Sequence, residues 1–202
     1  MIAIIDYGMG NLYSVEKAFA RLGAEAVVTS DPAVIGAAAK VILPGVGAFG
    51  DCMHNLEEYK LVPVIKEVAA RGTPFLGICL GLQMLFEGSE EDPGVAGLGI
   101  FPGMVRKINA PGLKIPHMGW NSLELGSPSP LLAGLPAAAY VYFVHSYHAV
   151  PADPGLVTAA TEYGERVTAA VGRANIQAVQ FHPEKSGDVG LKILQNFKEL
   201  AL

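Results

Sequence analysis

The sequence predicts a doubly wound α/β fold: a mainly parallel sheet with helices on both faces and added antiparallel strands in the C-terminal half. Strand-like and helix-like patterns alternate over residues 1–90, which is typical of a parallel sheet covered on both sides. After Gly94 the pattern changes to short β-like segments separated by Gly and Pro. The length of 202 residues and the apolar content of 51% suit one domain, residues 1–202, with a substantial core.

Each element follows from its own pattern. A helix is expected from Asn11, because apolar residues recur every three or four positions until Gly23 can end it. The last helix is expected to bury Ile193, Leu194 and Phe197. In order, the predicted strands are residues 2–6, 25–29, 40–43, 74–78, 104–108, 140–144, 156–161, 167–171 and 176–181, and further helices cover residues 62–71, 80–87 and 189–200.

Composition narrows the function classes. A net charge of −5 without a basic cluster argues against a nucleic-acid partner. Two cysteines give no disulfide framework, and Cys52, in an expected helix, is predicted to be inert packing. The N-terminus has neither the basic region nor the cleavage site of a signal peptide, so a soluble, cytoplasmic protein is expected. Neither a metal nor a cofactor is expected.

One cysteine lies where a nucleophile would be exposed. Residues 74–78 form an apolar run typical of a buried strand, residues 80–87 have a helical pattern, and Cys79 stands between them. Gly77 and Gly81 flank it, as a sharp strand-to-helix turn requires. Unpaired N–H groups at the helix N-terminus favour the thiolate. The pattern predicts a nucleophile elbow with sulfur in place of oxygen; the alternative is a small cysteine packed in the core.

A sulfur nucleophile needs a proton partner, and His182 is favoured among the five histidines. Glu184 follows two positions later, and alternate side chains of an extended segment point the same way. A carboxylate behind an imidazole fixes its tautomer and stabilises the imidazolium. The alternative is an ordinary surface loop. The remaining histidines are assigned to a surface helix (His54), a Pro-rich loop (His117) and the two sides of a Ser-Tyr pair (His145 and His148).

A glycine-rich turn, residues 44–50, directly follows the predicted strand 40–43. Such a turn can present backbone N–H groups to a developing negative charge, together with the N–H after the nucleophile. The predicted oxyanion hole is therefore formed by Val46, Gly47 and Leu80. Pro-Gly turns are also common as purely structural turns. This motif therefore indicates an oxyanion hole only in combination with the cysteine motif and the His-Glu motif.

The three motifs together resemble the class I (triad) glutamine amidotransferases. They are residues 77–83, the turn that starts at residue 44, and residues 182–184. Within that family, residues 5–12, 85–91, 116–121 and 181–186 resemble one branch, the glutaminase subunits of imidazole glycerol phosphate synthase in histidine biosynthesis. The resemblance runs nearly end to end and leaves none of the catalytic positions vacant.

The resemblance implies an enzyme that hydrolyses glutamine to glutamate and ammonia. Cys79 would attack the carboxamide carbon, its histidine partner would protonate the leaving ammonia, and water would hydrolyse the thioester. Gln83 is implied to contact the amino acid end of glutamine, although an exposed helix position is an alternative. The backbone implied to lie nearby belongs to His145, Ser146 and Tyr147, for which ordinary strand-end packing is the alternative.

The resemblance also implies a partner, because free ammonia would be wasted. A (β/α)₈ barrel cyclase would receive it within a heterodimer, and neither nucleic acid nor membrane is expected to bind. Trp120 is the chain's only Trp. Exposed Trp often anchors interfaces, but from the sequence Trp120 could equally fill the core. The implied partner-facing residues are Asn11, Met118, Trp120, Tyr142 and Lys185.

Two other functions remain open at this stage. A relative with the same elbow could use Cys79 as a redox sensor, but it would need neither His182 nor Glu184 in this order. The chain could instead supply ammonia to another synthase, such as the anthranilate enzyme; residues 116–121 and 181–186 weigh against that. A cysteine protease is a weaker alternative, since nothing resembles a peptide cleft.

Overall fold

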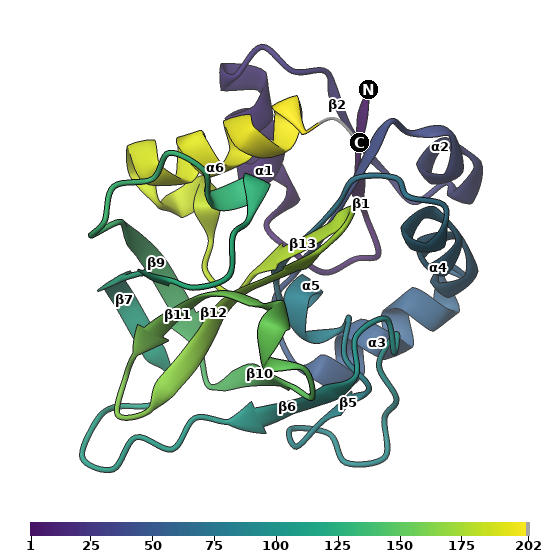
Figure 1. The fold of residues 1–202 in the computed structure, drawn as a ribbon. Helices are drawn as coiled ribbons and strands as arrows, with labels where there is room; N and C mark the ends of the chain where they lie inside the picture. Colours follow the sequence, from purple (N-terminus) through teal and green to yellow (C-terminus); the bar gives the residue numbers. More distant parts are fainter. Residues whose placement is uncertain (201–202) are drawn as a thin grey trace.

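The central sheet has the predicted, mainly parallel arrangement (Figure 1). The computed structural model describes residues 1–200, and among them eight strands form this sheet in the order β2-β1-β3-β4-β13-β12-β11-β8. Neighbours from β2 to β13 pair in parallel, whereas those from β13 to β8 are antiparallel. The bounds are β1 Ile2–Ile5, β2 Ala26–Thr29, β3 Lys40–Gly45, β4 Phe75–Cys79, β8 Glu124–Leu125, β11 Val157–Glu162, β12 Arg166–Arg173 and β13 Ile176–Val179.

Helices cover both faces of the sheet, as expected (Figure 1). Alternate residues of β1 point to opposite faces, so Ile5 joins one core and Ile4 the other. On the second face Phe19 and Phe197 meet edge to face, with ring centroids 6.4 Å apart. The helices α1 (Leu12–Arg21) and α6 (Gly187–Glu199) cover this second face, and α2 (Pro32–Ala37), α3 (Phe49–Glu58) and α4 (Val62–Ala70) cover the first.

Two smaller sheets flank the central one. One contains β10 (Tyr147–Pro151), β6 (Gly103–Lys107) and β5 (Gly88–Ser89), and the other pairs β7 (His117–Ser122) with β9 (Tyr140–His145). The prediction that His117 lies in a loop is therefore wrong, because it opens a strand and pairs with His145. The sequence pattern does not predict α2, β5, β8 or β10 as elements either. Residues 1–200 also contain three 3₁₀ turns, η1 Pro130–Leu132, η2 Pro154–Leu156 and η3 Pro183–Lys185.

The helix predicted over residues 80–87 is wrong in its length. The helix α5 ends after one turn, at Leu80–Gln83. Beyond it the backbone of residues 84–87 bonds to the loop of residues 97–101 instead of continuing the helical ladder. Gly97 permits this approach, because a Cβ at that position would lie 2.1 Å from the carbonyl oxygen of Phe86. Tertiary pairing thus overrides a helical apolar pattern.

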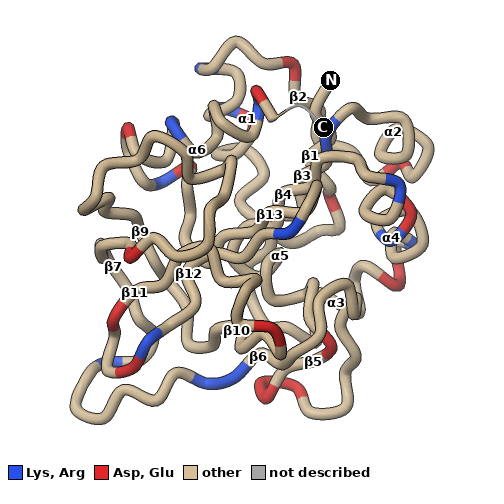
Figure 2. Tube along the Cα trace, viewed as in Figure 1, with Lys and Arg blue, Asp and Glu red and all other residues tan. Residues whose placement is uncertain are grey.

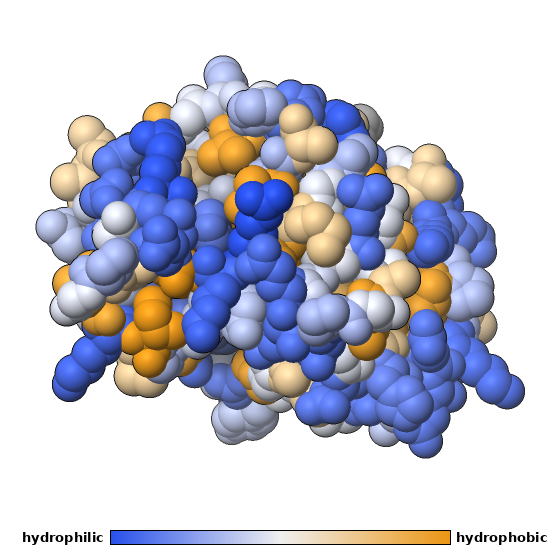
Figure 3. Space-filling view, turned by 90° about the horizontal axis from the view of Figure 1, so that it is seen from below, coloured by the Kyte–Doolittle hydropathy of each residue, from blue (hydrophilic) through white to orange (hydrophobic). Residues whose placement is uncertain are grey.

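Charged residues of both signs are interspersed around the outer helices and loops (Figure 2). Seen from below, the surface is largely hydrophilic, with separate hydrophobic patches between the hydrophilic residues (Figure 3). Within residues 1–200, every helix is too short or too polar to cross a membrane.

Candidate active site

Cys79 occupies the sharp corner that the sequence predicts. It ends β4 and immediately precedes α5, with φ 56° and ψ −111°, a conformation that residues other than Gly rarely adopt. The flanking glycines are needed for close packing: a Cβ on Gly77 would lie 2.8 Å from the carbonyl oxygen of Gly81. A Cβ on Gly81 would lie 1.8 Å from that of Leu43. The corner thus depends on the absence of both side chains, and Cys79 lines a pocket beside it.

The packing at Gly81 leads to a stability prediction. Gly81→Ala is expected to lower the free energy of unfolding by about 3 kcal/mol or more, because the new methyl group would overlap backbone atoms of β3 that cannot move alone. Urea denaturation measures the change. Gly36→Ala is the matched control, since its Cβ would meet only a side-chain carbon of Val64 at 3.7 Å; a change below about 1 kcal/mol is expected there. Equal effects at the two positions would contradict the packing argument.

The register of two parallel strands brings the second motif to the cysteine. Val179 of β13 pairs with Ile78 of β4, so the chain after Val179 passes beside Cys79. His182 follows, and its Nδ1–H donates to Oε1 of Glu184 at 2.8 Å, with both side chains almost completely buried. The predicted contact is present, but the extended geometry given for it is wrong, because Glu184 lies in the 3₁₀ turn η3.

The electrostatics of His182 favour its charged form. Burial alone would lower the pKa of His182, but the interactions of the ring with Cys79 and Glu184 outweigh burial and raise this pKa to about 10. Within residues 1–200, Nε2 of His182 is buried without a hydrogen-bond partner. With Nδ1 taken by Glu184, Nε2 is the ring nitrogen that remains available to exchange a proton in the pocket.

The glycine-rich turn lies against the same corner. Gly45, the last residue of β3, pairs with Cys79, and a Cβ on Gly45 would lie 2.8 Å from Cβ of Leu80. Gly47 has φ 102°, which glycine tolerates readily. The Cys52 thiol donates to the carbonyl oxygen of Val46 at 3.5 Å. Because a trans peptide directs its C=O and N–H oppositely, the N–H of Gly47 points away from Cys52.

The pocket has a volume of about 260 Å³. All the residues predicted to bind substrate or to form the oxyanion hole line this pocket. Of the predicted catalytic residues, Cys79 and His182 line it, and Glu184 lies behind His182. The lining comprises Val46, Gly47, Cys79, Leu80, Gln83, Glu91, Pro116, Val144, His145, Ser146, Tyr147 and His182.

Gln83 is a buried wall of this pocket, so the alternative of an exposed helix position is wrong. Its Nε2 donates to the carbonyl oxygen of Tyr147 and to Oε1 of Gln180, each at 3.0 Å. Its Oε1 is buried and has no hydrogen-bond partner in the described part of the chain. A buried carbonyl oxygen without a donor is costly, so this atom is suited to accept a hydrogen bond from a bound molecule.

Two buried histidines support the backbone of the same wall. Nδ1–H of His145 donates to the carbonyl oxygen of Tyr147 at 2.8 Å, and Nε2 of His145 lies 3.0 Å from Nδ1 of His117. Burial lowers the pKa of His145 to about 3 and that of His117 to about 4. The pair therefore remains uncharged at neutral pH, and it fixes the backbone where β9 meets β10.

Sequence reasoning missed four residues around the pocket. Pro116 and Val144 line it, as does Glu91, whose carboxylate accepts from the N–H of Phe49 at 2.9 Å, at the start of α3. Gln180 lies behind Gln83 and is fully buried. A lone polar residue in the apolar run of residues 178–181 was the available signal for Gln180. Glu91 ends the segment of residues 85–91 that carries part of the resemblance, but no local pattern shows that its loop packs against α3.

The predicted partner-facing residues lie mainly along β7 and β9. Trp120 is 56% exposed and Met118 61%, so the alternative that Trp120 fills the core is wrong. The Trp120 ring meets Tyr142 edge to face at 6.2 Å, and Nζ of Lys185 lies 5.9 Å from the centre of the Tyr142 ring. Asn11 immediately precedes α1, which contacts the turn that carries Lys185.

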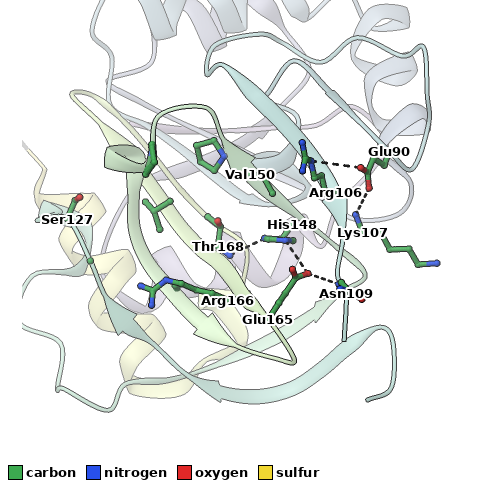
Figure 4. A pocket seen from close by; sticks show the side chains of 15 residues that line it. Glu90, Arg106, Lys107, Asn109, Ser127, His148, Val150, Glu165, Arg166 and Thr168 are labelled. Carbon is green, nitrogen blue, oxygen red and sulfur yellow. Dashed lines mark hydrogen bonds and ion pairs between the residues drawn. The ribbon is translucent and has the colours of Figure 1, made fainter. Parts of the chain in front are cut away.

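A larger cavity, of about 800 Å³, lies elsewhere, between β6, β10, β11 and β12 (Figure 4). Its charged groups largely pair with one another: Arg106 lies 3.9 Å from Glu90, and Glu165 lies 3.7 Å from His148 and accepts from the N–H of Asn109. It contains none of the predicted site residues. The smaller pocket therefore remains the candidate site.

Comparison with known proteins shows the family to which the chain is similar over nearly its whole length. The model of the family described as glutamine amidotransferase class-I matches residues 3–200. A relative from Moorella thermoacetica named imidazole glycerol phosphate synthase subunit HisH is 56% identical, with 98% of this chain and 94% of the relative covered. A relative of the same name from Thermosynechococcus vestitus is 57% identical, with 98% of this chain and 96% of the relative covered. Another from Methanothermobacter thermautotrophicus is 54% identical, with 99% of this chain and 98% of the relative covered.

Solved structures share the fold. A glutamine amidotransferase crystal structure superposes with a TM-score of 0.76 at 21% identity, with 98% of this chain and all of the other (100%) covered. The structure of PurLQS from Thermotoga maritima has a TM-score of 0.71 at 21% identity, covering 98% of this chain and 97% of the other. At such identities the likeness concerns the fold alone.

Proposed function

The chain belongs to the class I glutamine amidotransferase family, and from this premise we propose that it is the glutaminase subunit of imidazole glycerol phosphate synthase, acting in histidine biosynthesis. The observation that carries the proposal is one pocket that brings together the elbow cysteine, a histidine with a raised pKa and a buried amide whose oxygen has no hydrogen-bond partner within residues 1–200. Residues 1–202 would act as one amidotransferase domain. Relatives above 50% identity over nearly the whole chain support this branch rather than another synthase.

The proposed reaction begins with attack by the Cys79 thiolate on the carboxamide carbon of glutamine. His182 would then give its Nε2 proton to the departing nitrogen, because an amide nitrogen leaves only when it is protonated. The same imidazole, now neutral, would deprotonate the water that hydrolyses the thioester. Glu184 would hold the ring by its Nδ1–H throughout, which the buried 2.8 Å contact supports.

The tetrahedral intermediate needs donors for its oxyanion. The N–H of Leu80, directly after the nucleophile, and the N–H groups of Val46 and Gly47 are the proposed donors, since all three residues line the pocket. The amino acid end of glutamine would lie against Oε1 of Gln83 and the backbone of residues 145–147. Oε1 of Gln83 is suited to the α-ammonium group of glutamine. This oxygen is a hydrogen-bond acceptor with no donor within residues 1–200, and an ammonium group can only donate.

The ammonia would pass to a cyclase subunit with a (β/α)₈ barrel, which closes imidazole glycerol phosphate. The exposed Met118 and Trp120, with Tyr142, Lys185 and Asn11, form the proposed docking face. An assay of glutamate release with and without the cyclase and its nucleotide ligand tests the whole proposal. Strong release only in the complete mixture is expected, whereas oxidant-dependent modification of Cys79 without turnover would favour a sensor. Co-purification with a different synthase would overturn the assignment.

The docking face gives one prediction of its own. Trp120→Ala is expected to weaken binding of the cyclase about tenfold or more, because large exposed aromatic residues carry much of an interface's affinity. Calorimetric titration measures the change, and circular dichroism checks that the variant is folded. Met104→Ala is the control, since Met104 is also exposed but lies on β6, outside the proposed face. Unchanged affinity for Trp120→Ala would remove Trp120 from the interface.

A further inference from the structure

Gln180 is a buried amide that the reaction described above does not use. It is 0% exposed and follows β13 directly, and its backbone N–H donates to the carbonyl oxygen of Ala169 at 2.8 Å. Its Oε1 accepts from Gln83, and its Nε2 donates to Sγ of Cys79 at 3.8 Å. One side chain therefore joins the proposed substrate wall to the proposed nucleophile.

The donor and the acceptor of each hydrogen bond in the series Tyr147, Gln83, Gln180 and Cys79 are fixed. The carbonyl oxygen of Tyr147 can only accept, so it must face the Nε2 end of Gln83. That same Nε2 then requires the oxygen end of Gln180. The amide of Gln180 must consequently turn its N–H groups toward Sγ of Cys79. A backbone carbonyl two residues beyond His145 thus sets which end of a distant amide meets the sulfur.

A hydrogen-bond donor beside the sulfur favours the thiolate over the neutral thiol. An N–H that points at Sγ stabilises a thiolate, whereas an amide oxygen in the same place would oppose it. Being fully buried, Gln180 keeps this contact free of competing water. The register explains its position, because Val179 pairs with Ile78, and the next residues along the chain are Gln180 and Cys79.

We propose that Gln180 is a further functional residue of this site, stabilising the Cys79 thiolate by its N–H while holding Gln83 in place by its oxygen. The expected effect of Gln180 on glutamine turnover rests on the proposed function, but its contact with Sγ of Cys79 can be tested without turnover. The thiolate contact makes Gln180 a catalytic residue, and its hold on Gln83 is a positioning role.

The test compares two buried glutamines, Gln177 in β13 and Gln180 directly after it. Gln180→Met removes the N–H donor with little change of volume, and Gln177→Met does the same in β13, where Gln177 is equally buried but bonds to Ser129 and Ala174 instead. The rate of Cys79 alkylation by iodoacetamide is followed against pH, with the label located by mass spectrometry. Because Cys52 is buried and burial raises its pKa to about 11, Cys52 is expected to react far more slowly.

For Gln180→Met, the midpoint of the alkylation profile is expected to move to higher pH, with alkylation about tenfold slower below that midpoint. Its kcat/KM for glutamine in the complex is expected to fall about a hundredfold. Gln177→Met should match the wild type in both. An unmoved midpoint for Gln180→Met, or the same shift for Gln177→Met, would overturn the inference.

Two further arrangements keep the test decisive. Should Gln180→Met fail to fold, Gln180→Asn is measured against Gln177→Asn with the same expectations, because the shorter amide cannot reach both Gln83 and Sγ. If the wild-type complex did not hydrolyse glutamine at all, the proposed function would fail. The alkylation profiles would still decide whether Gln180 acts on the sulfur.

Discussion

Replacing Cys79 by Ala is expected to lower glutamine-dependent synthesis by the complex at least ~10⁴-fold and to leave ammonia-dependent synthesis intact. The large loss follows because a methyl group cannot form the thioester through which the proposed hydrolysis passes. The ammonia-dependent rate is preserved because free ammonia bypasses this subunit's chemistry. Both rates are measured on the same purified complex, with either glutamine or an ammonium salt as nitrogen donor.

The ammonia-dependent rate is also the internal control for folding. Cys79 lies at a strained corner with a positive φ, so a variant that misfolded would also fail to assemble with the cyclase. Loss of both activities would indicate a structural role for Cys79 rather than a catalytic one. Retention of glutamine-dependent synthesis would remove the thiol from the mechanism altogether.

Much of the fold could be predicted because local pattern and tertiary structure agree there. The strands around β1 and β3 alternate with helices whose apolar stripes face them, and Asn11 and Gly23 bound α1 as expected. The corner at Cys79 was predictable for a stronger reason. Only glycine fits at Gly77 and Gly81, where the backbone comes within reach of a Cβ.

The sequence-based predictions that were wrong share one cause. In each case contacts with a distant segment decide the local structure. Residues 84–87 lose their helix to the loop of residues 97–101. The strand β7 exists only because it pairs with β9, and its sequence of His, Gly, Trp and Asn has no alternation to reveal it. The placement of Glu91 and Gln180 in the site likewise depends on contacts between segments far apart in the chain. Such contacts leave little trace in a single sequence.

The second large effect concerns His182, whose replacement by Ala is expected to lower kcat for glutamine hydrolysis about 10⁴-fold or more. Glu184→Gln is expected to be milder, about 10²–10³-fold, because the amide oxygen can still accept from Nδ1–H while the negative charge is lost. Steady-state kinetics of the complex measure both. Equal losses for the two variants would count against an orienting role for Glu184. His54→Ala is the control, since His54 lies exposed on α3, outside the pocket.

The two variants should also differ in pH dependence, and the sign follows from the charges around the ring. Burial lowers the pKa of His182, whereas Cys79 and Glu184 together raise it to about 10. Removing the carboxylate in Glu184→Gln takes away one of the two raising groups, so the imidazolium loses its proton at lower pH. Since the imidazolium supplies the proton for the leaving ammonia, the alkaline limb of the kcat profile is expected to move to lower pH in Glu184→Gln. An alkaline limb that stays at the wild-type position would mean that Glu184 holds the ring without tuning its charge.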